Sequence, residues 1–149
     1  MNVFEEFRDL SGLEQLRALI KSGRRPPIGD TLGFALVEID AGRAVFAGTP
    51  GPNAYNPLGS IHGGYAATLL DSACGCAVHS KLDASQAYTT LELKIAYHKA
   101  MTDRTGEVRA TGTVLSFGRR VAFAEAKLTD AAGKLYASAT STLLVFDRA

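Results

Sequence analysis

An aspartate inside an otherwise uncharged segment is the first residue of this sequence that could do chemistry. Between Ala54 and Ser80, Asp71 is the only formally charged side chain, and most of its neighbours are apolar or small. A buried carboxylate without a partner is costly, so we expect Asp71 to be well hydrogen-bonded or to favour its protonated form. Such a carboxylate is a candidate general base or nucleophile, with a purely structural aspartate as the equal alternative.

A His-Gly-Gly sequence at residues 62–64 could bind a carbonyl oxygen. The first N–H groups of a helix lack partners within the helix and lie at the positive end of its dipole. Two glycines would allow a tight entry and the close approach of a ligand. Gly64 and Asp71 would share a helix face two turns apart, which suits hydrolysis of a thioester. Taken alone, His-Gly-Gly indicates no more than a helix entry.

One buried helix and a sheet must position these groups. Apolar residues surround the segment 64–80 on all sides, so we expect a helix that is buried on most of them. The segment 91–97 alternates apolar and polar residues, which is typical of a strand. Short turns join the later strands and indicate an antiparallel sheet, giving an α+β fold. The expected strands are 31–40, 43–49, 91–97, 106–117, 119–129 and 134–146.

The first residues predict a separate helical extension. Apolar residues recur at helical spacing over 2–21, Ser11-Gly12 suggests a break, and Gly23 should end the second helix. Pro26-Pro27 should prevent the helix from resuming. We therefore divide the chain into an extension, 1–25, and a main domain, 26–149.

Composition excludes several classes of function. The chain has 149 residues, 46% of them hydrophobic and 21% charged, with a formal net charge of +1. This balance argues against nucleic-acid or membrane partners, and we expect neither a signal peptide nor a membrane span. Cys74 and Cys76 would point in different directions on the helix, which fits a reduced, cytoplasmic protein. The three His and two Cys lack metal-ligand spacing, so we expect no metal.

The segment Asn-Pro-Leu-Gly-Ser-Ile-His-Gly-Gly at 56–64, followed by Leu-Leu-Asp-Ser-Ala at 69–73, resembles the signature of a known family. It is similar to the PaaI-type hotdog-fold acyl-CoA thioesterases, related to phenylacetyl-CoA and 4-hydroxybenzoyl-CoA enzymes. The similarity continues through 118–125 and 130–137 and covers roughly residues 30–146. The resemblance implies a hotdog fold, in which an antiparallel sheet wraps around one long central helix.

The resemblance also implies a mechanism. The Gly63 N–H and the Asn56 side-chain amide would polarise the thioester carbonyl. Asp71 would act as a general base on water, or would attack directly through an anhydride. A Ser or Thr from the facing subunit would help hold the water, and by position this residue is Thr90, with Thr89 in reserve.

Two of these residues have plainer interpretations. Thr90 would share a strand face with Glu92 and Lys94, so it could be an ordinary exposed strand residue. For His62 we favour a ring that hydrogen-bonds nearby backbone and shapes the Asn56 loop over a catalytic role.

Substrate contacts are expected at two places. Arginines suit the phosphates of coenzyme A, although an arginine pair at a turn is more often simply solvated. The resemblance places coenzyme A contacts near the turn that contains Arg119 and Arg120. We expect an acyl pocket lined by Leu69, neighbouring residues of the helix and the Asn56 loop. The substrate-binding residues expected overall are Gly64, Tyr65, Leu70, Gly118, Arg119 and Arg120.

The resembled fold implies a homodimer that pairs into a homotetramer, with each site built from two chains. Coenzyme A would be part of the substrate, and no cofactor is expected. Two alternatives stay open: a hydratase-type hotdog enzyme acting on enoyl-CoA, and a non-catalytic acyl-CoA-binding hotdog protein. The presence of Asp71, Asn56 and His-Gly-Gly together favours the thioesterase.

Overall fold

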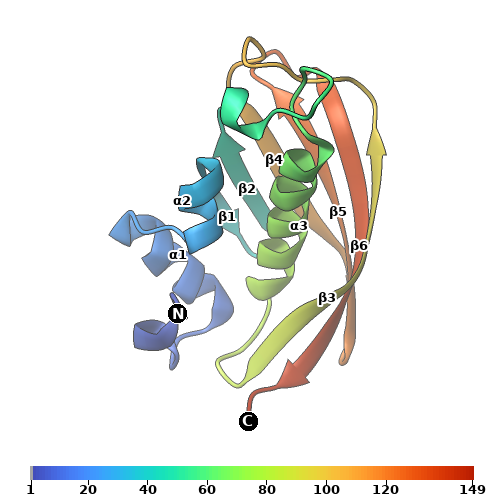
Figure 1. The fold of residues 1–149 in the computed structure, drawn as a ribbon. Coiled ribbons are helices and arrows are strands. Elements are labelled where there is room, and N and C mark those ends of the chain that lie inside the picture. Colours follow the sequence, from blue (N-terminus) through green and yellow to red (C-terminus); the bar gives the residue numbers. More distant parts are fainter. Residues whose placement is uncertain (1) are drawn as a thin grey trace.

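A computed structural model describes residues 2–149, and its central feature is one long helix, α3, held against a curved sheet (Figure 1). Residue 1 of the expected extension lies outside the described residues. In chain order the elements are the 3-10 helix η1 (Glu5–Phe7), α1 (Gly12–Ser22), α2 (Pro27–Leu32), β1 (Phe34–Asp40), β2 (Arg43–Gly48), the 3-10 helix η2 (Pro52–Ala54), α3 (Gly63–His79), β3 (Gln86–Tyr97), β4 (Val108–Phe117), β5 (Val121–Asp130) and β6 (Leu135–Asp147).

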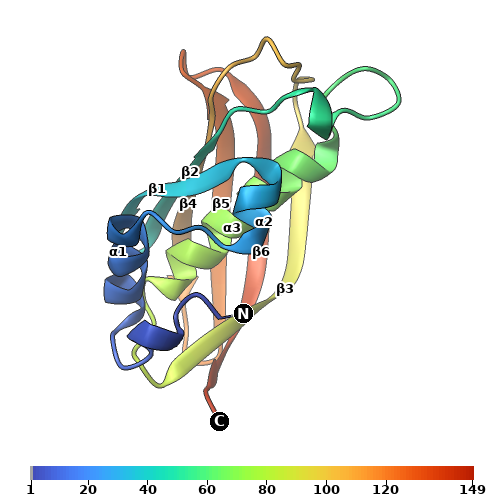
Figure 2. The ribbon, with the colours of Figure 1, turned by 60° about the vertical axis from the view of Figure 1, so that its left-hand side comes forward.

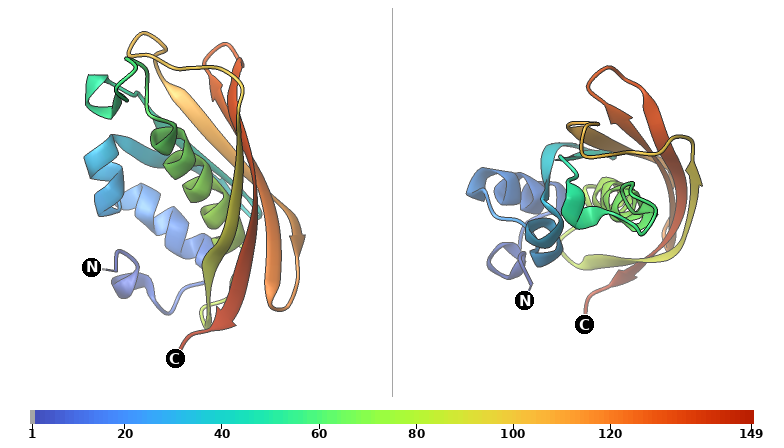
Figure 3. Two further views of the ribbon diagram at one scale, coloured as in Figure 1. Left: turned by 45° about the vertical axis from the view of Figure 1, so that its right-hand side comes forward. Right: turned by 45° about the horizontal axis from the view of Figure 1, so that its top comes forward.

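The six-stranded sheet has the order β1-β2-β4-β5-β6-β3, and every neighbouring pair is antiparallel. The sheet curves around α3, while α1 and α2 lie on the other side of that helix (Figure 3). Gly112 of β4 lets the helix come close, because a Cβ there would lie 2.3 Å from the Ala73 carbonyl oxygen. The expected fold, a sheet wrapped around one central helix, is confirmed, and it is the hotdog fold.

One face of α3 is not covered by the sheet. The prediction of a helix buried on most sides is confirmed, since ten of its 17 residues are buried. The residues left half-buried or exposed include Gly64, Thr68, Asp71, Ser72 and Cys76. Their spacing of three to four residues places them along one face of the helix. Asp71 therefore lies on the face that the sheet leaves open.

The extension contains the expected break and the second of the two helices expected around it. The Ser11 hydroxyl accepts the Glu14 N–H while the Glu14 carboxylate accepts the Ser11 N–H, so a capping box starts α1 at the predicted break. Gly23 ends the helix in the left-handed conformation, as predicted. Before the break, only the three-residue 3-10 turn η1 forms.

The short helix α2 was not predicted. We expected a strand from residue 31, but α2 occupies Pro27–Leu32 and the strand begins at Phe34. Proline lacks the N–H that a first helical residue leaves unpaired, so Pro27 starts this helix instead of preventing one. Gly33, at φ 70°, ends it. The boundaries of β2, β4, β5 and β6 agree with the predicted strands within two residues.

Buried polar contacts fasten the extension to the end of α3. The His79 Nε2 and Gln15 Oε1 atoms are 2.8 Å apart, and the Gln15 Nε2 group donates to the carbonyls of Phe7 and Leu10. The Gly12 N–H donates to the Leu82 carbonyl at 3.0 Å. Both side chains of the His79–Gln15 pair are buried, so the extension packs as part of the folded domain.

His79 should make the protein less stable in mild acid. Burial, aided by the charge of Arg148, lowers the pKa of His79 to about 4 from an ordinary 6.5. Between these values the unfolded chain binds a proton that the folded chain does not, so stability falls as the pH drops through this window. We expect a loss of about 2 kcal/mol between pH 7 and pH 5.

Urea unfolding at both pH values measures this loss. His79→Phe keeps a flat ring at the position but cannot titrate, so its unfolding free energy should depend less on pH. Parallel losses in the wild type and His79→Phe would show that other groups are responsible.

No helix among residues 2–149 has the length and apolar character needed to span a membrane.

Candidate functional site

Asp71 has a hydrogen-bonding partner on the neighbouring edge strand. The Thr90 hydroxyl donates to Asp71 Oδ1 at 3.0 Å, so the expected need of this carboxylate for a hydrogen bond is met. Within residues 2–149 no donor takes the other oxygen, Oδ2, which can accept a proton from water. We expected the threonine to come from a facing subunit. That expectation is wrong for this contact, because Thr90 bonds to Asp71 of its own chain.

A β-bulge turns Thr90 toward the helix. Thr90 pairs with Leu143 of β6, but Glu92 pairs with the adjacent Thr142, so Leu91 is an extra residue in β3. Leu143 is fully buried on the helix side of the sheet, whereas Thr142 bonds to the exposed Glu92 carboxylate. Thr90 and Glu92 therefore do not share a strand face, and the simple alternation we assumed fails at Leu91.

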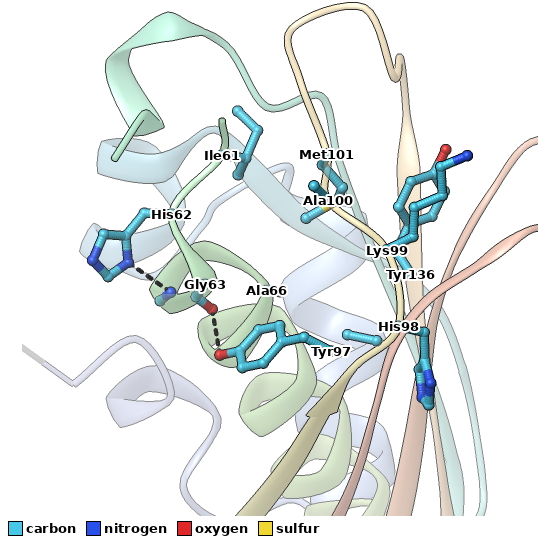
Figure 4. A pocket seen from close by; sticks show the side chains of 12 residues that line it. Ile61, His62, Gly63, Ala66, Tyr97, His98, Lys99, Ala100, Met101 and Tyr136 are labelled. Atoms are coloured by element: carbon cyan, nitrogen blue, oxygen red, sulfur yellow. Dashed lines mark hydrogen bonds between the residues drawn. The ribbon is translucent and has the colours of Figure 1, made fainter. Parts of the chain in front are cut away.

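His62 caps the start of α3. Its Nδ1 atom accepts the Gly64 N–H at 2.8 Å, which confirms the expected bond to nearby backbone (Figure 4). This bond occupies the Gly64 amide, and the Tyr65 N–H donates to the His62 carbonyl. The Gly63 N–H has no acceptor within residues 2–149. Gly63 therefore offers the free donor at the positive end of the helix dipole.

Tyr97 packs over this helix start and was not singled out from the sequence. Its hydroxyl donates to the Gly63 carbonyl at 2.9 Å, and its ring lies where a Cβ at position 63 would come within 3.0 Å (Figure 4). The absence of a side chain at Gly63 thus lets the Tyr97 ring of the same chain pack closely against the helix start. The only sequence signal was a tyrosine ending the alternating segment of β3.

Asn56 organises the loop before α3. Its Oδ1 atom accepts the N–H groups of Leu58 and Ser60, and its Nδ2 group donates to the Ser60 hydroxyl at 3.0 Å. An amide has two N–H donors, so one is left for a ligand. The Asn56 side chain therefore stabilises the loop conformation and has one remaining N–H that could polarise a carbonyl.

Gly63 and Asp71 open into two different cavities. A cavity of about 450 Å³ at the start of α3 is lined by Gly63, Gly64 and Tyr97, among others. A second, of about 420 Å³, is lined by Asp71 and Tyr88 but not by Gly63. The two positions are eight residues apart on the helix, which corresponds to roughly 12 Å along its axis. Gly64 and Asp71 do share the open face of α3, but within a single chain the helix start and Asp71 line separate cavities, so their joint action on one carbonyl stays a prediction.

Three residues assigned to substrate contacts belong to the core. Tyr65 is 3% exposed and Leu69 and Leu70 are 0% exposed. Their side chains are on the buried side of α3, away from the face that contains Asp71. None of the three is among the residues that line the two cavities described above, so their expected roles in the pocket stay predictions, whereas Gly64 does line a cavity.

The expected coenzyme A contacts lie at the other end of the sheet. Gly118, Arg119 and Arg120 form the exposed turn between β4 and β5, beside a surface hollow also lined by Gln86. Gln86 starts β3, while Tyr97 ends it next to Gly63. One chain therefore does not bring the arginine turn together with the start of α3.

The cysteines do not compete with Asp71 as nucleophiles. Burial raises the pKa of both Cys74 and Cys76 to about 12, so the thiols are protonated at neutral pH. Both are free thiols, as their spacing predicted. Across residues 2–149, no three His, Cys, Asp or Glu side chains gather closely enough to hold a metal ion.

Comparison with known proteins adds independent information. The profile of the thioesterase superfamily matches residues 58–137. A curated relative, the 1,4-dihydroxy-2-naphthoyl-CoA hydrolase of Listeria monocytogenes, is 27% identical over 116 residues, covering 78% of this chain and 93% of the relative.

Solved structures agree with this match. A thioesterase family protein from Silicibacter pomeroyi has a TM-score of 0.78 and 25% identity, covering 89% of this chain and 98% of that one. A mutant of the phenylacetic acid degradation protein PaaI from Thermus thermophilus has a TM-score of 0.73 and 26% identity, covering 80% and 98%.

Proposed function

Because this chain belongs to the thioesterase superfamily and is a PaaI-type hotdog enzyme that hydrolyses acyl-CoA thioesters, we propose that Asp71 is its catalytic carboxylate. The observation that carries this proposal is a half-buried carboxylate with one oxygen fixed by Thr90, facing an apolar cavity. The acyl-CoA substrate brings its own coenzyme A, and the reaction needs no cofactor beyond water.

Each catalytic centre uses two copies of the chain. An oxyanion donor and a base must both lie about 3 Å from the atoms that react at one carbonyl. Gly63 and Asp71 of one chain, roughly 12 Å apart along α3, cannot do this. Gly63 and Asn56 of one copy therefore act with Asp71 and Thr90 of another.

The edge of the sheet supports such pairing. The twelve-residue strand β3 has an unpaired edge, and its Leu91 and Tyr97 are 58% and 57% exposed. Long unpaired edges normally need to be covered, and pairing of two β3 edges would extend the sheet across two copies. Two such dimers would then associate into the homotetramer.

The chemistry follows from the geometry of the carboxylate. Asp71 Oδ2 accepts a proton from a water molecule whose oxygen attacks the thioester carbonyl carbon, while Thr90 fixes Oδ1 and helps to hold the water. The Gly63 N–H stabilises the oxyanion that forms. When the C–S bond breaks, the proton passes from Asp71 to the sulfur, releasing the free acid and the coenzyme A thiol.

The arginine turn binds the phosphates of coenzyme A in this proposal. Arg119 and Arg120 lie beside Gln86, at the end of the sheet where β3 begins. Gln86 precedes Thr90 by four residues on the same strand. At about 3.3 Å per residue, this places Gln86 about 13 Å along the strand from Thr90, a span suited to the pantetheine arm. Forked guanidinium groups bind phosphate oxygens well.

A panel of thioesters tests the proposed function. Phenylacetyl-, benzoyl-, hexanoyl-, palmitoyl- and crotonyl-CoA are mixed with the protein, and free thiol is followed with a chromogenic disulfide. Thiol release that requires Asp71 supports the proposal. Loss of the crotonyl double bond without thiol would favour a hydratase instead. Tight binding without either reaction would favour a non-catalytic binding protein.

Thr90→Val should lower kcat by about tenfold or more. The variant has nearly the same shape but loses the hydroxyl that donates to Asp71, and a hydrogen bond to a charged group contributes about 1.5–3 kcal/mol. Thr90→Ser keeps the hydroxyl and should restore most of the rate. Equal rates for the Val and Ser variants would mean that the hydroxyl does not assist Asp71.

A further inference from the structure

The cavity next to Asp71 has a wall that comes from the start of the chain. On one side it is lined by Asp71 and neighbouring residues of α3, with Tyr88 of β3. On the other side lie Val3, Phe4 and Ile28, which precede the main strands. Figure 2 shows α2 in front of the middle of α3, with the N-terminal segment below it, near the lower end of that helix. All of these N-terminal residues lie outside the residues, 58–137, that match the superfamily profile.

The N-terminal wall, defined here as Val3, Phe4, Leu19 and Ile28, is fixed in place by several contacts. The Phe4 ring stacks on the His79 ring, with centroids 4.9 Å apart and planes at 20°. Arg24 pairs with Glu6 and lies over the Phe7 ring at 5.6 Å, so the segment before α1 is tied to the segment after it. The side chains of this wall therefore limit the cavity in the folded protein.

The cavity is apolar and has one charge. Most of its other lining residues are aliphatic or aromatic, including Phe34, Phe46 and Tyr88. Tyr88 and Cys76 are neutral at physiological pH because burial raises the pKa of both side chains. Among the lining residues there is no Lys, Arg or His. A second carboxylate would therefore meet Asp71 without a compensating cation.

Resting on the proposed function, we propose that this cavity is the acyl subsite, and that the N-terminal wall restricts it to compact, uncharged, apolar acyl groups. A thioester whose carbonyl lies at Asp71 must direct its acyl group into the apolar space beside that carboxylate. The volume of about 420 Å³ lies toward the small end of the range for ligand pockets. Val3, Phe4 and Ile28 determine how far an acyl chain can extend.

Two variants test the wall in opposite directions. Phe4→Ala removes a ring from it and should raise kcat/KM for palmitoyl-CoA, relative to hexanoyl-CoA, by about tenfold. Ile28→Trp places a larger side chain in the wall and reduces the space in the cavity. Because Ile28 is 50% exposed, this substitution should not prevent folding. It should lower kcat/KM for phenylacetyl-CoA, relative to acetyl-CoA, by a similar factor. Leu115→Ala, which alters an exposed leucine on β4 away from the cavity, is the matched control.

The readout is a ratio between substrates, so it is independent of the overall rate. Succinyl-CoA, which has a second carboxylate, should be a poor substrate for all the variants. If the protein hydrolyses thioesters but neither Phe4→Ala nor Ile28→Trp changes the ratios, the N-terminal wall does not limit the acyl group. Efficient hydrolysis of succinyl-CoA by the wild type would overturn the expected charge selectivity. Absence of thiol release from every thioester would instead contradict the proposed function itself.

Discussion

Asp71→Asn is expected to reduce thiol release by about a thousandfold or more, while the protein stays folded and still binds acyl-CoA. Asparagine has almost the same shape, and its Oδ1 can still accept the Thr90 hydroxyl at the observed position. The amide cannot take a proton from water, so the base is lost without opening a cavity. The test compares kcat/KM with the dissociation constant for the same thioester, which the inactive variant should bind without consuming it.

The control replaces a carboxylate that lies elsewhere. Asp40→Asn changes an exposed aspartate at the end of β1 and should leave kcat/KM within twofold or so of the wild type. If Asp71→Asn kept most of the activity, the carboxylate could not be the base, and the mechanism proposed here would be wrong. If it lost binding as well as turnover, Asp71 would have a structural role in shaping the cavity.

The local parts of this site could be predicted from the sequence. A lone acid in an apolar segment pointed to Asp71, and a His-Gly-Gly helix entry predicted unpaired amides at the start of α3 and a His62 ring bonded to nearby backbone. These features depend only on residues close together in the chain. For the same reason, the capping box at Ser11 lies at the predicted break, and the left-handed Gly23 ends α1 where the sequence predicted its end.

Features that depend on packing between distant segments could not be predicted. Thr90 was assigned to the wrong strand face because one bulged residue, Leu91, reverses the alternation. Tyr65 and Leu70 were assigned to the substrate because a helix that is apolar all round does not indicate which side the sheet will cover. The wall around Phe4 arises only when residues far apart in sequence pack against α3.

Gly63→Pro should remove the proposed oxyanion donor and lower kcat by about a hundredfold to a thousandfold. Position 63 is the first residue of α3, where proline is well tolerated because its missing N–H has no partner within the helix. His62, at φ −59° and ψ 136°, already has the extended conformation that a residue before proline prefers. The variant therefore deletes one hydrogen-bond donor and leaves the helix start in place.

Gly63→Ala is the matched control for this substitution. Alanine keeps the N–H but adds the same Cβ, which would lie 3.0 Å from the ring of Tyr97. Tyr97 is 57% exposed and its ring can shift, and both variants place the same Cβ against it. A large loss of kcat in the proline variant alone assigns the effect to the N–H. Equal losses in both variants would assign it to crowding against Tyr97, and the oxyanion role of Gly63 would be wrong.

Mixing Gly63→Pro chains with Asp71→Asn chains tests whether two copies build one centre. If Gly63 of one copy acts with Asp71 of the other, a mixed dimer has one centre with both residues intact and one with neither. Random pairing of equal amounts makes half of the dimers mixed, so about a quarter of the wild-type activity should return. If each chain contained a complete centre, every centre in the mixture would have a defect, and the activity would stay at the level of the two variants alone. Co-expression with two different affinity tags isolates the mixed dimers, for which about half of the wild-type activity is expected. Gly63 and Asp71 of one chain are roughly 12 Å apart along α3, too far to act on one carbonyl. We therefore expect activity to be recovered in the mixed dimers.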